Sequence, residues 1–295
     1  MRPRLSPQSP DAGNQFENMN SVLLTLARVA MAAGMLAAIV GCCGAQDTAG
    51  VAVVPKAGEA RVVELGGGVS LDLVWISPGV FQMGSPFGEE GRFIVEGRRH
   101  QVTITRGFWM GKYLVTQQQW ERVMGNNPSH AKDPRLPVDQ VNWNDCQNFI
   151  TALNRILAKA GLTSALPSEA QWEYACRAGT ETRFWPGDRV ADLARVAWFA
   201  DNSNNQPHQV GRKPANPWGL CDMHGNIWQW CQDWLDSYRR DAVSDPRGPD
   251  AGQERVLRGG SWSSEPDICR AAYRFSYPPD YRIMTAGLRI VASGK

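Results

Sequence analysis

Seven cysteines give this sequence its widest choice of chemistry, because a thiolate can bind a metal, act as a nucleophile or enter a disulfide. They are Cys42, Cys43, Cys146, Cys176, Cys221, Cys231 and Cys269. No two of them form a CxxC motif, so the sequence does not favour a zinc ribbon or a thioredoxin-like site. The four histidines show no HxxxH or HExxH spacing and therefore predict no histidine-based metal site.

Cys42 follows an uncharged apolar run, residues 29–41, that is too short to span a bilayer and is typical of a signal-peptide core. The run ends in Ile39-Val40-Gly41-Cys42, which resembles a bacterial lipobox. We therefore expect residues 1–41 to be a lipoprotein-type signal peptide, with Met19 as an alternative start. A diacylated Cys42 would anchor the mature chain to a membrane. The alternatives are a generic secretory signal and a buried core helix.

Export would place the remaining six cysteines in an oxidising compartment. They could form up to three disulfides there, and the sequence leaves their connectivity open. We expect one or two bridges, with the other thiols buried as small apolar groups. The stretch that follows the lipobox is rich in Ala, Gly and Val and poor in aromatic residues, which predicts a flexible tether over residues 42–68.

A second group of reactive side chains lies near the C-terminus. The candidate catalytic residues are Ser261, Trp262, Ser264, Cys269 and Arg274. One of the arginines in this region could hold a carboxylate or a peptide carbonyl. We expect most of the nearby arginines (Arg270, Arg274, Arg282 and Arg289) to pair with acids instead.

The elements that must position these groups are short. Residues 70–80 and 101–112 have the β-branched and aromatic content of strands. Thr116, Asn144 and Ser168 each precede a Gln by three residues, which predicts three helix starts with reciprocal capping. Gly125 and Gly179 are expected to end the first and third helices. The second helix carries Phe149, Leu153, Ile156 and Leu157 on one face.

Composition supports a loop-rich globular body. The chain has 295 residues, of which 43% are hydrophobic and 20% charged, which excludes intrinsic disorder. Its net charge of +2 gives no reason to expect nucleic acid as a partner. With 29 Gly and 19 Pro the elements should be short, and the 12 Trp should mostly be buried together, each with a partner for its indole N–H. One α+β domain over residues 69–293 accounts for the pattern.

Seven blocks in order along the chain resemble the sulfatase-modifying-factor family, which contains the formylglycine-generating enzymes. The blocks are VWISPGVFQMGS (74–85), KYLVTQQQW (112–120), PVDQVNWNDC (137–146), LPSEAQWEYACRAG (166–179), PWGLCDMHGNIWQWCQDW (217–234), RVLRGGSW (255–262) and AGLRIV (286–291). The resemblance implies a single compact α+β domain, distantly like C-type lectins, with little regular secondary structure. Fold alone does not imply the reaction.

The family's enzymes use oxygen and two copper(I)-binding cysteines to oxidise a sulfatase cysteine to an aldehyde. The first cysteine of the family pattern corresponds to Ser264, a hard neutral hydroxyl that suits copper(I) poorly, and Cys269 has the spacing of the second. The resemblance therefore argues against copper and against formylglycine formation in this chain. For an enzyme of altered chemistry, the resemblance implies a cleft lined by Ser261, Trp262, Ser264, Cys269 and Arg274, together with Trp228.

The resemblance also implies structural calcium, which prefers six to eight oxygen ligands. One set, made of backbone carbonyls and one acidic side chain, would comprise His224, Gly225, Ile227 and Gln229, where Gln229 replaces the family's usual Glu. Asp201 and Asn202 would belong to a second set.

Three functions stay open at this point. The first is an envelope oxidoreductase or protein-modifying enzyme of altered chemistry, for which pyoverdine-maturation proteins are relatives that lack the cysteine pair. The second is a non-catalytic lipoprotein that binds or assembles other proteins. The third is formylglycine formation itself. All three place the chain in a bacterial cell envelope, facing the periplasm or the exterior, with a protein or peptide as the expected partner and no nucleic acid.

Overall fold

Twelve strands, four α-helices and three short 3-10 helices build the part of the chain that this computed structural model describes, residues 55–294. The predicted signal peptide, Met19 and Cys42 lie outside these residues. The strands are β1 Ala60–Gly66, β2 Val69–Ile76, β3 Gly79–Met83, β4 His100–Ile104, β5 Phe108–Gly111, β6 Leu162–Ala165, β7 Trp228–Trp234, β8 Val243–Ser244, β9 Arg255–Arg258, β10 Phe275–Tyr277, β11 Ala286–Gly287 and β12 Val291–Gly294. The helices are η1 Ile94–Glu96, α1 Gln117–Met124, α2 Trp143–Leu157, η2 Ala158–Ala160, α3 Glu169–Arg177, α4 Val190–Val196 and η3 Pro266–Cys269.

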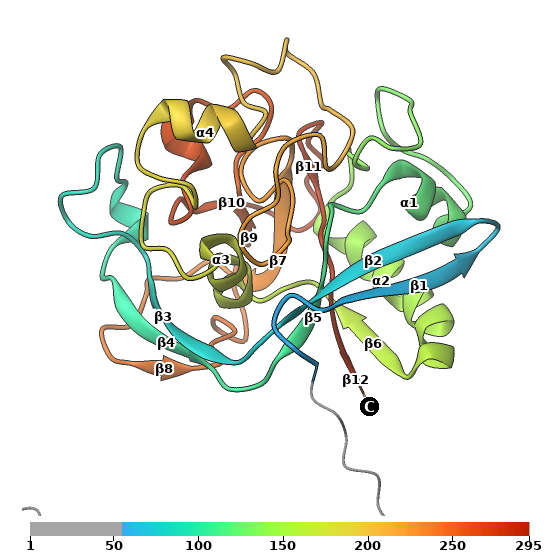
Figure 1. Ribbon diagram of the computed structural model, residues 1–295, viewed down its shortest axis with the longest axis horizontal. Coiled ribbons are helices and arrows are strands. Elements are labelled where there is room, and N and C mark those ends of the chain that lie inside the picture. The colour runs from blue at the N-terminus through green and yellow to red at the C-terminus, as the bar shows by residue number, and fades with distance from the viewer. Residues whose placement is uncertain (1–54, 295) are drawn as a thin grey trace, which may run out of the picture. The chain divides into compact units, whose positions relative to one another are not determined.

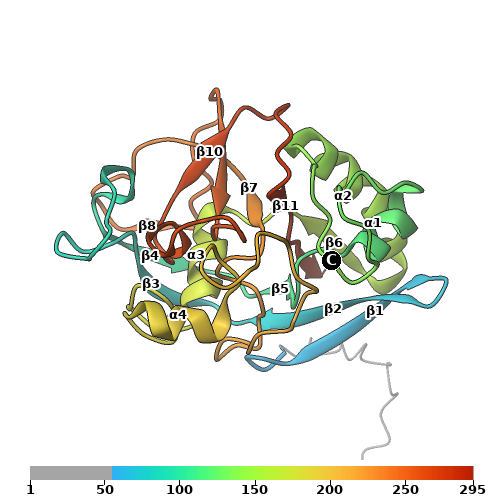
Figure 2. The same ribbon diagram turned by 90° about the horizontal axis from the view of Figure 1, so that it is seen from above.

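Three sheets organise these elements. A five-stranded sheet has the order β1-β2-β5-β12-β6, a four-stranded sheet the order β10-β9-β7-β11, and a three-stranded sheet the order β3-β4-β8. All neighbours are antiparallel except β11 with β7 and β4 with β8. In both ribbon views, α1 and α2 lie beside the β1–β2 and β6 side of the molecule, and the three-stranded sheet lies on the opposite side (Figures 1 and 2). This mixed arrangement confirms the predicted α+β class.

The structure corrects the predicted tether at its C-terminal end. Strand β1 (Ala60–Gly66) pairs with β2 in an antiparallel hairpin that turns at Gly67 and Gly68, both at positive φ. Alternate side chains of β1, Val63 and Leu65, are buried in the core. The sequence prediction underestimated this strand because its alternation is short and it ends in the first of three consecutive glycines. The folded domain therefore begins before residue 69, where the sequence analysis placed its start.

Helix starts follow the predicted capping chemistry at two of three positions. The Thr116 and Ser168 hydroxyls accept hydrogen bonds from the Gln119 and Gln171 amides, and each Gln side chain accepts from the cap's own N–H. The middle prediction is wrong by two residues. Asn142 caps α2 there, and Asp145 supplies the reciprocal acceptor. At the third helical position an Asp side chain can accept from the N–H of the cap residue, as a Gln does. The pair Asn142 and Asp145 therefore forms the capping box in place of the predicted pair Asn144 and Gln147.

Each region predicted to be a strand forms two strands. Residues 70–80 divide between β2 and β3 around Ser77-Pro78, and residues 101–112 divide between β4 and β5 around Gly107. A Cβ at Gly107 would collide with the Trp75 ring, so only glycine permits this close approach. The breaks let the strands change sheets, which keeps the elements short.

Aromatic packing agrees only partly with the expectation from composition. Five tryptophans are buried, and the other seven are half-buried. The indoles of Trp143, Trp172 and Trp230 donate to the Cys231 carbonyl, the Gln229 side chain and the Val141 carbonyl, respectively. The indole N–H groups of Trp75, Trp198 and Trp262 have no partner within residues 55–294. Trp75 and Trp198 nevertheless pack against the rings of Trp109 and His208, with centroids 5.3 and 3.8 Å apart.

The expected disulfides do not form among the cysteines that the structure describes. Cys146, Cys176, Cys221, Cys231 and Cys269 are all buried free thiols. Four of them are fully buried, in three different apolar clusters. Burial raises the pKa of the Cys221 thiol to about 11 and that of Cys176 to about 12. These cysteines therefore behave as small apolar side chains, the alternative that the sequence left open. Across residues 55–294, no helix is long and apolar enough to cross a membrane.

Candidate functional site

The loop after β9 brings three predicted site residues together. Gly259 and Gly260 both have positive φ and turn the chain so that Ser261 faces back toward Ser264. The Ser261 amide donates to the Ser264 hydroxyl at 2.9 Å, and the two hydroxyl oxygens lie 3.0 Å apart. Both serines are buried. The hydroxyl of Ser264 is thus engaged by its own loop, and no histidine contacts it among the described residues.

Cys269 lies directly beneath this loop. A Cβ added to Gly260 would come within 2.6 Å of the Cys269 sulfur, so the glycine is required by the packing of the thiol. Burial raises the pKa of this thiol well above its usual range, and the Gly225 and Ser261 amides, which face the sulfur, lower it only in part. Cys269 is therefore a protonated thiol at neutral pH and a weak nucleophile. The Ser261 amide is the shared neighbour of the Ser264 hydroxyl and the Cys269 sulfur.

Trp262 belongs to the same loop. Its amide donates to the Asn226 carbonyl at 2.8 Å, and its carbonyl accepts from the Ser203 hydroxyl at 2.7 Å. Trp228 packs elsewhere, stacked on Phe275 with ring centroids 5.0 Å apart. The predicted cleft residues therefore lie in two places. Ser261, Ser264 and Cys269 form a buried cluster, whereas Trp228 packs on Phe275 of β10.

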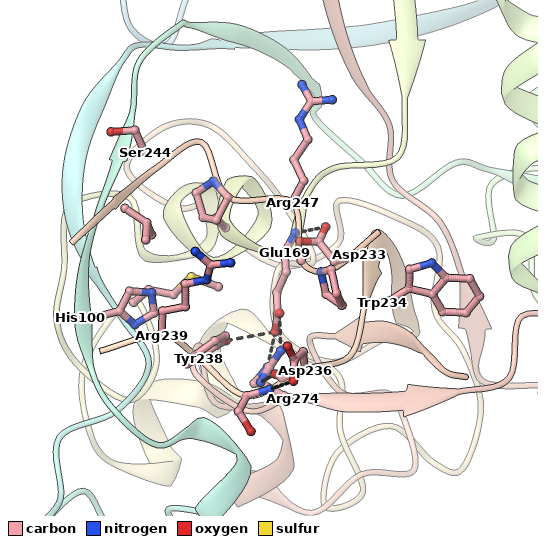
Figure 3. A pocket seen from close by; sticks show the side chains of 17 residues that line it. His100, Glu169, Asp233, Trp234, Asp236, Tyr238, Arg239, Ser244, Arg247 and Arg274 are labelled. Atoms are coloured by element: carbon pink, nitrogen blue, oxygen red, sulfur yellow. Dashed lines mark hydrogen bonds and ion pairs between the residues drawn. The ribbon is translucent and has the colours of Figure 1, made fainter. Parts of the chain in front are cut away.

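Arg274 does not bond to the serine cluster, because its guanidinium bonds to other residues. It forms two hydrogen bonds to the Glu169 carboxylate, at 2.6 and 2.7 Å, and donates to the Asp236 carbonyl at 2.8 Å. Its guanidinium lies 4.0 Å from the centroid of the Tyr238 ring (Figure 3). Burial lowers the pKa of Arg274, but the charge and the hydrogen bonds of Glu169, together with Tyr238, outweigh burial and raise the pKa. Arg274 is committed to holding the start of α3 and is not free to bind a substrate carbonyl.

The other C-terminal arginines confirm the expectation that most of them pair with acids. Arg270 is fully buried and pairs with Glu89 and Glu96, and half-exposed Arg282 pairs with Asp145. Arg289 differs, because it has no salt bridge in residues 55–294. It donates instead to the carbonyl oxygens of Gly111, Lys112, Cys221 and Asp222 and to the side-chain oxygen of Gln229.

Of the predicted calcium ligands, the Gln229 side chain does not fit that ion in this arrangement. The Gln229 oxygen accepts from the Trp172 indole and from Arg289, and its amide nitrogen donates to the Asp222 carbonyl. A fully buried guanidinium thus contacts the oxygen that would face the ion. Burial lowers the pKa of Arg289 to about 10, which keeps it charged at neutral pH.

The His224 ring and the Asn202 side chain also bond to other protein groups. The His224 ring bonds to the Cys269 carbonyl and to the Trp185 amide, and burial lowers the pKa of His224 to about 4, so the ring is neutral. The Asn202 oxygen accepts from the Phe199 amide, and Asp201 is exposed. Gly225 and Ile227 are buried, and within residues 55–294 no three His, Cys, Asp or Glu side chains cluster as a metal site.

A cavity of about 300 Å³ lies next to Arg274, and the sequence did not predict it. Asp233, Tyr238, Arg239 and Arg247 line it, together with Glu169 at the start of α3 (Figure 3). Burial, reinforced by the nearby Glu169 carboxylate, raises the pKa of Asp233 to about 7. The sequence signal for this cavity was two basic residues, Arg239 and Arg247, next to a stretch rich in Gly and Pro. Such a pattern does not identify a pocket by itself.

Comparisons with known proteins agree with the family resemblance of the seven blocks. A family model described as a sulfatase-modifying factor enzyme 1-like domain matches residues 69–293. The chain is 27% identical over 273 residues to the chaperone protein LppX of Paenibacillus barcinonensis, covering 76% of this chain and 90% of LppX. It is 28% identical over 209 residues to the formylglycine-generating enzyme of Mus musculus, covering 65% of this chain and 53% of that enzyme.

A solved structure supports the fold. The structure of PvdO from Pseudomonas aeruginosa matches with a TM-score of 0.71 at 26% identity, covering 81% of this chain and 100% of PvdO. The family model covers most of the chain and includes both the loop after β9 and the start of α3. By sequence and by fold, this chain belongs to the sulfatase-modifying factor family.

Proposed function

We propose that this chain is a non-catalytic binding module of the bacterial cell envelope, anchored by a lipid on Cys42 and engaging partner proteins without copper chemistry. The observation that carries the proposal is the pair of side chains at the positions of the family's copper-binding cysteines. Ser264 offers a neutral hydroxyl that its own loop already engages, and Cys269 offers a fully buried thiol. A hydroxyl is a poor ligand for copper(I), so a bis-thiolate site cannot form.

The remaining thiols give no support to an alternative thiol-based oxidation. Burial raises the pKa of Cys146, Cys176, Cys221 and Cys231. A redox-active cysteine usually has a lowered pKa and is accessible, and these cysteines have the opposite properties.

One relative supports a binding role. The chain covers 90% of a protein named as the chaperone protein LppX, whereas it spans about half of the mouse formylglycine-generating enzyme. A chaperone acts by binding other proteins and needs no catalytic group. In this fold most of the buried charged side chains pair with one another and stabilise the structure. A lipid on Cys42 would keep such a module at the membrane surface.

We expect the purified chain to leave a sulfatase-type cysteine peptide unchanged when it is incubated with copper(I) and oxygen. The physical reason is the missing second thiolate at Ser264. Mass spectrometry of the peptide detects the loss of the thiol and the gain of an aldehyde, and a formylglycine-generating enzyme serves as the positive control. Copper-dependent aldehyde formation by this chain would overturn the proposed function.

Labelling with a palmitate analogue in a bacterial host is expected to modify the wild-type chain and not the Cys42→Ala variant. The thiol of Cys42 is the expected lipid acceptor, and alanine cannot take its place. In-gel fluorescence of the membrane fraction gives the readout, and Cys43→Ala is the matched control that should keep its label. Equal labelling of the Cys42→Ala variant would refute the anchor.

A further inference from the structure

Asp233 is a buried acid without a charged partner. Its residue is 4% exposed, and within residues 55–294 its carboxyl group forms no ion pair. Other buried acids differ from it, since Glu96, Glu169 and Glu173 each pair with an arginine. A carboxylate that leaves water without a counter-ion loses solvation, and burial raises the pKa of Asp233 to about 7. A cation that reached this carboxylate would offset the loss.

One oxygen of the Asp233 carboxyl is open to a ligand. Oδ2 accepts from the Glu169 amide at 2.9 Å, whereas Oδ1 accepts no hydrogen bond from another residue of the described part of the chain. The unpartnered polar atoms that are sealed from solvent within residues 55–294 belong to other residues. Asp233 lines the cavity of about 300 Å³ (Figure 3), and a Cβ added to Gly248 would lie 3.5 Å from Oδ1. Oδ1 therefore faces this cavity, which we call the Asp233 cavity.

The lining of the Asp233 cavity carries charges of both signs. Arg239 and Arg247 are exposed, and among the described residues neither forms an ion pair. The exposed carboxylate of Asp236 has no ion pair there either. Glu169 and Arg274, which also line the cavity, neutralise each other. A lining of balanced charge favours a ligand that carries a positive and a negative group.

The unpaired charges lie at different places in the cavity. In Figure 3, the Arg239 guanidinium lies on the other side of the cavity from Asp233, and the Arg247 side chain extends away from Asp233. A ligand that crosses the cavity can therefore meet a carboxyl oxygen at one end and a guanidinium at the other. Arginine is suited to this task, because two parallel N–H groups can donate to one carboxylate.

The aromatic rings of the cavity already hold cations. The Arg274 guanidinium lies 4.0 Å from the centroid of the Tyr238 ring, and the Arg255 guanidinium lies 3.4 Å from that of the Trp234 ring. An aromatic cage for a quaternary ammonium needs free ring faces. The positive group of a ligand must therefore bind to the carboxyl oxygen, which requires an ammonium with N–H donors.

We propose that the Asp233 cavity binds a small zwitterion, with the ammonium group on Oδ1 of Asp233 and the carboxylate on Arg239. The ammonium donates to an oxygen that has no other donor, and the carboxylate supplies the anion that Arg239 lacks. A free amino acid has this chemistry, and so does a lysine at the C-terminus of a partner protein. A cavity of about 300 Å³ has the size of a small-ligand pocket.

Binding should tighten as the pH rises through 7. The ligand's ammonium pairs with the ionised carboxyl, and a pKa of about 7 leaves Asp233 mostly neutral at pH 6 and mostly ionised at pH 8. The expected gain in affinity is roughly tenfold. Asp233 is faced by Glu169 of α3, Arg274 before β10 and Arg255 of β9. The other charged or titratable groups of the lining are His100, Asp236, Tyr238, Arg239 and Arg247.

The test is isothermal titration calorimetry of the full chain with 6-aminohexanoate, whose flexible chain can adapt to the separation of the two sites. Hexylamine and hexanoate each carry one of its two charges, and each should bind roughly tenfold more weakly. The Asp233→Asn variant keeps an acceptor for the Glu169 amide, and at pH 8 it should lose roughly tenfold in affinity for 6-aminohexanoate and most of the pH dependence. Asp241→Asn is the matched control, because Asp241 is exposed and does not line the cavity.

The Arg239→Gln variant tests the other end of the site. It should weaken the binding of 6-aminohexanoate and leave the binding of hexylamine unchanged, because hexylamine has no carboxylate. A variant that had lost its structure would weaken both. Arg240→Gln is the matched control, since Arg240 is the exposed neighbour of Arg239 and does not line the cavity.

Three outcomes would overturn the proposal. They are no binding of 6-aminohexanoate to the wild type, unchanged binding by the Asp233→Asn variant, and binding of hexanoate as tight as that of the zwitterion. A Gly-Ser peptide with a C-terminal lysine distinguishes the sources: tighter binding than 6-aminohexanoate assigns the site to a partner's C-terminus, and weaker binding to a free amino acid. None of these results changes the copper and peptide assay, so failure of this inference is distinguishable from failure of the proposed function.

Discussion

Replacing Ser264 by cysteine is expected to create a copper(I) site that the wild-type chain lacks. In the structure, the Ser261 amide bonds to the Ser264 hydroxyl and also faces the Cys269 sulfur. A cysteine at position 264 would therefore place a second sulfur next to Cys269. Two thiolates suit copper(I), whereas a hydroxyl and a thiol do not. The expected change is from no bound copper at this loop to one ion per chain.

A competition titration with a copper(I) chelator measures the stoichiometry and the affinity. Because both ligands must lose a proton and burial raises the pKa of Cys269, affinity should rise with pH. Ser263→Cys is the matched control, since Ser263 is a neighbouring serine that is exposed. A wild-type chain that binds copper as well as the Ser264→Cys variant would show that the buried thiol needs no second sulfur.

The Arg258→Met variant is expected to lose about 3–5 kcal/mol of unfolding free energy, because it leaves buried carboxylates short of a partner. Arg258 is fully buried, pairs with Glu173 and lies 3.6 Å from Glu169. Its other N–H groups donate to carbonyl groups of the loop before β10, including that of Ala272 at 3.0 Å. The remaining partners of the two acids, Arg177 and Arg274, cannot replace these contacts.

Urea unfolding followed by tryptophan fluorescence gives the unfolding free energy of each variant. The control is Arg282→Met, which breaks a pair that is half-exposed on the arginine side and should cost no more than about 1 kcal/mol. If the two variants unfold at the same urea concentration, the buried network contributes no more than a surface pair. A loss of the expected size would be a large part of the stability of an ordinary domain.

Interactions between residues close in sequence allowed much of the fold to be predicted from the sequence. The capping boxes at Thr116 and Ser168 join residues three positions apart, so the motif alone contains both partners. The apolar face of α2 also follows from spacing, and Phe149, Leu153 and Leu157 are buried as predicted. Seven ordered blocks identified the family, because its fold is built from those blocks. The short alternation in β1 was too weak a signal beside its three glycines.

The sequence by itself determined the family, the α+β fold and the replacement of a copper ligand at Ser264, because each is written in residue type and order. Only the tertiary structure decided how the charged side chains are used. Arg274 meets Glu169 across 105 positions of sequence, and Arg289 meets Gln229 across 60. Pairings over such distances depend on how the sheets pack, and local spacing carries no record of them.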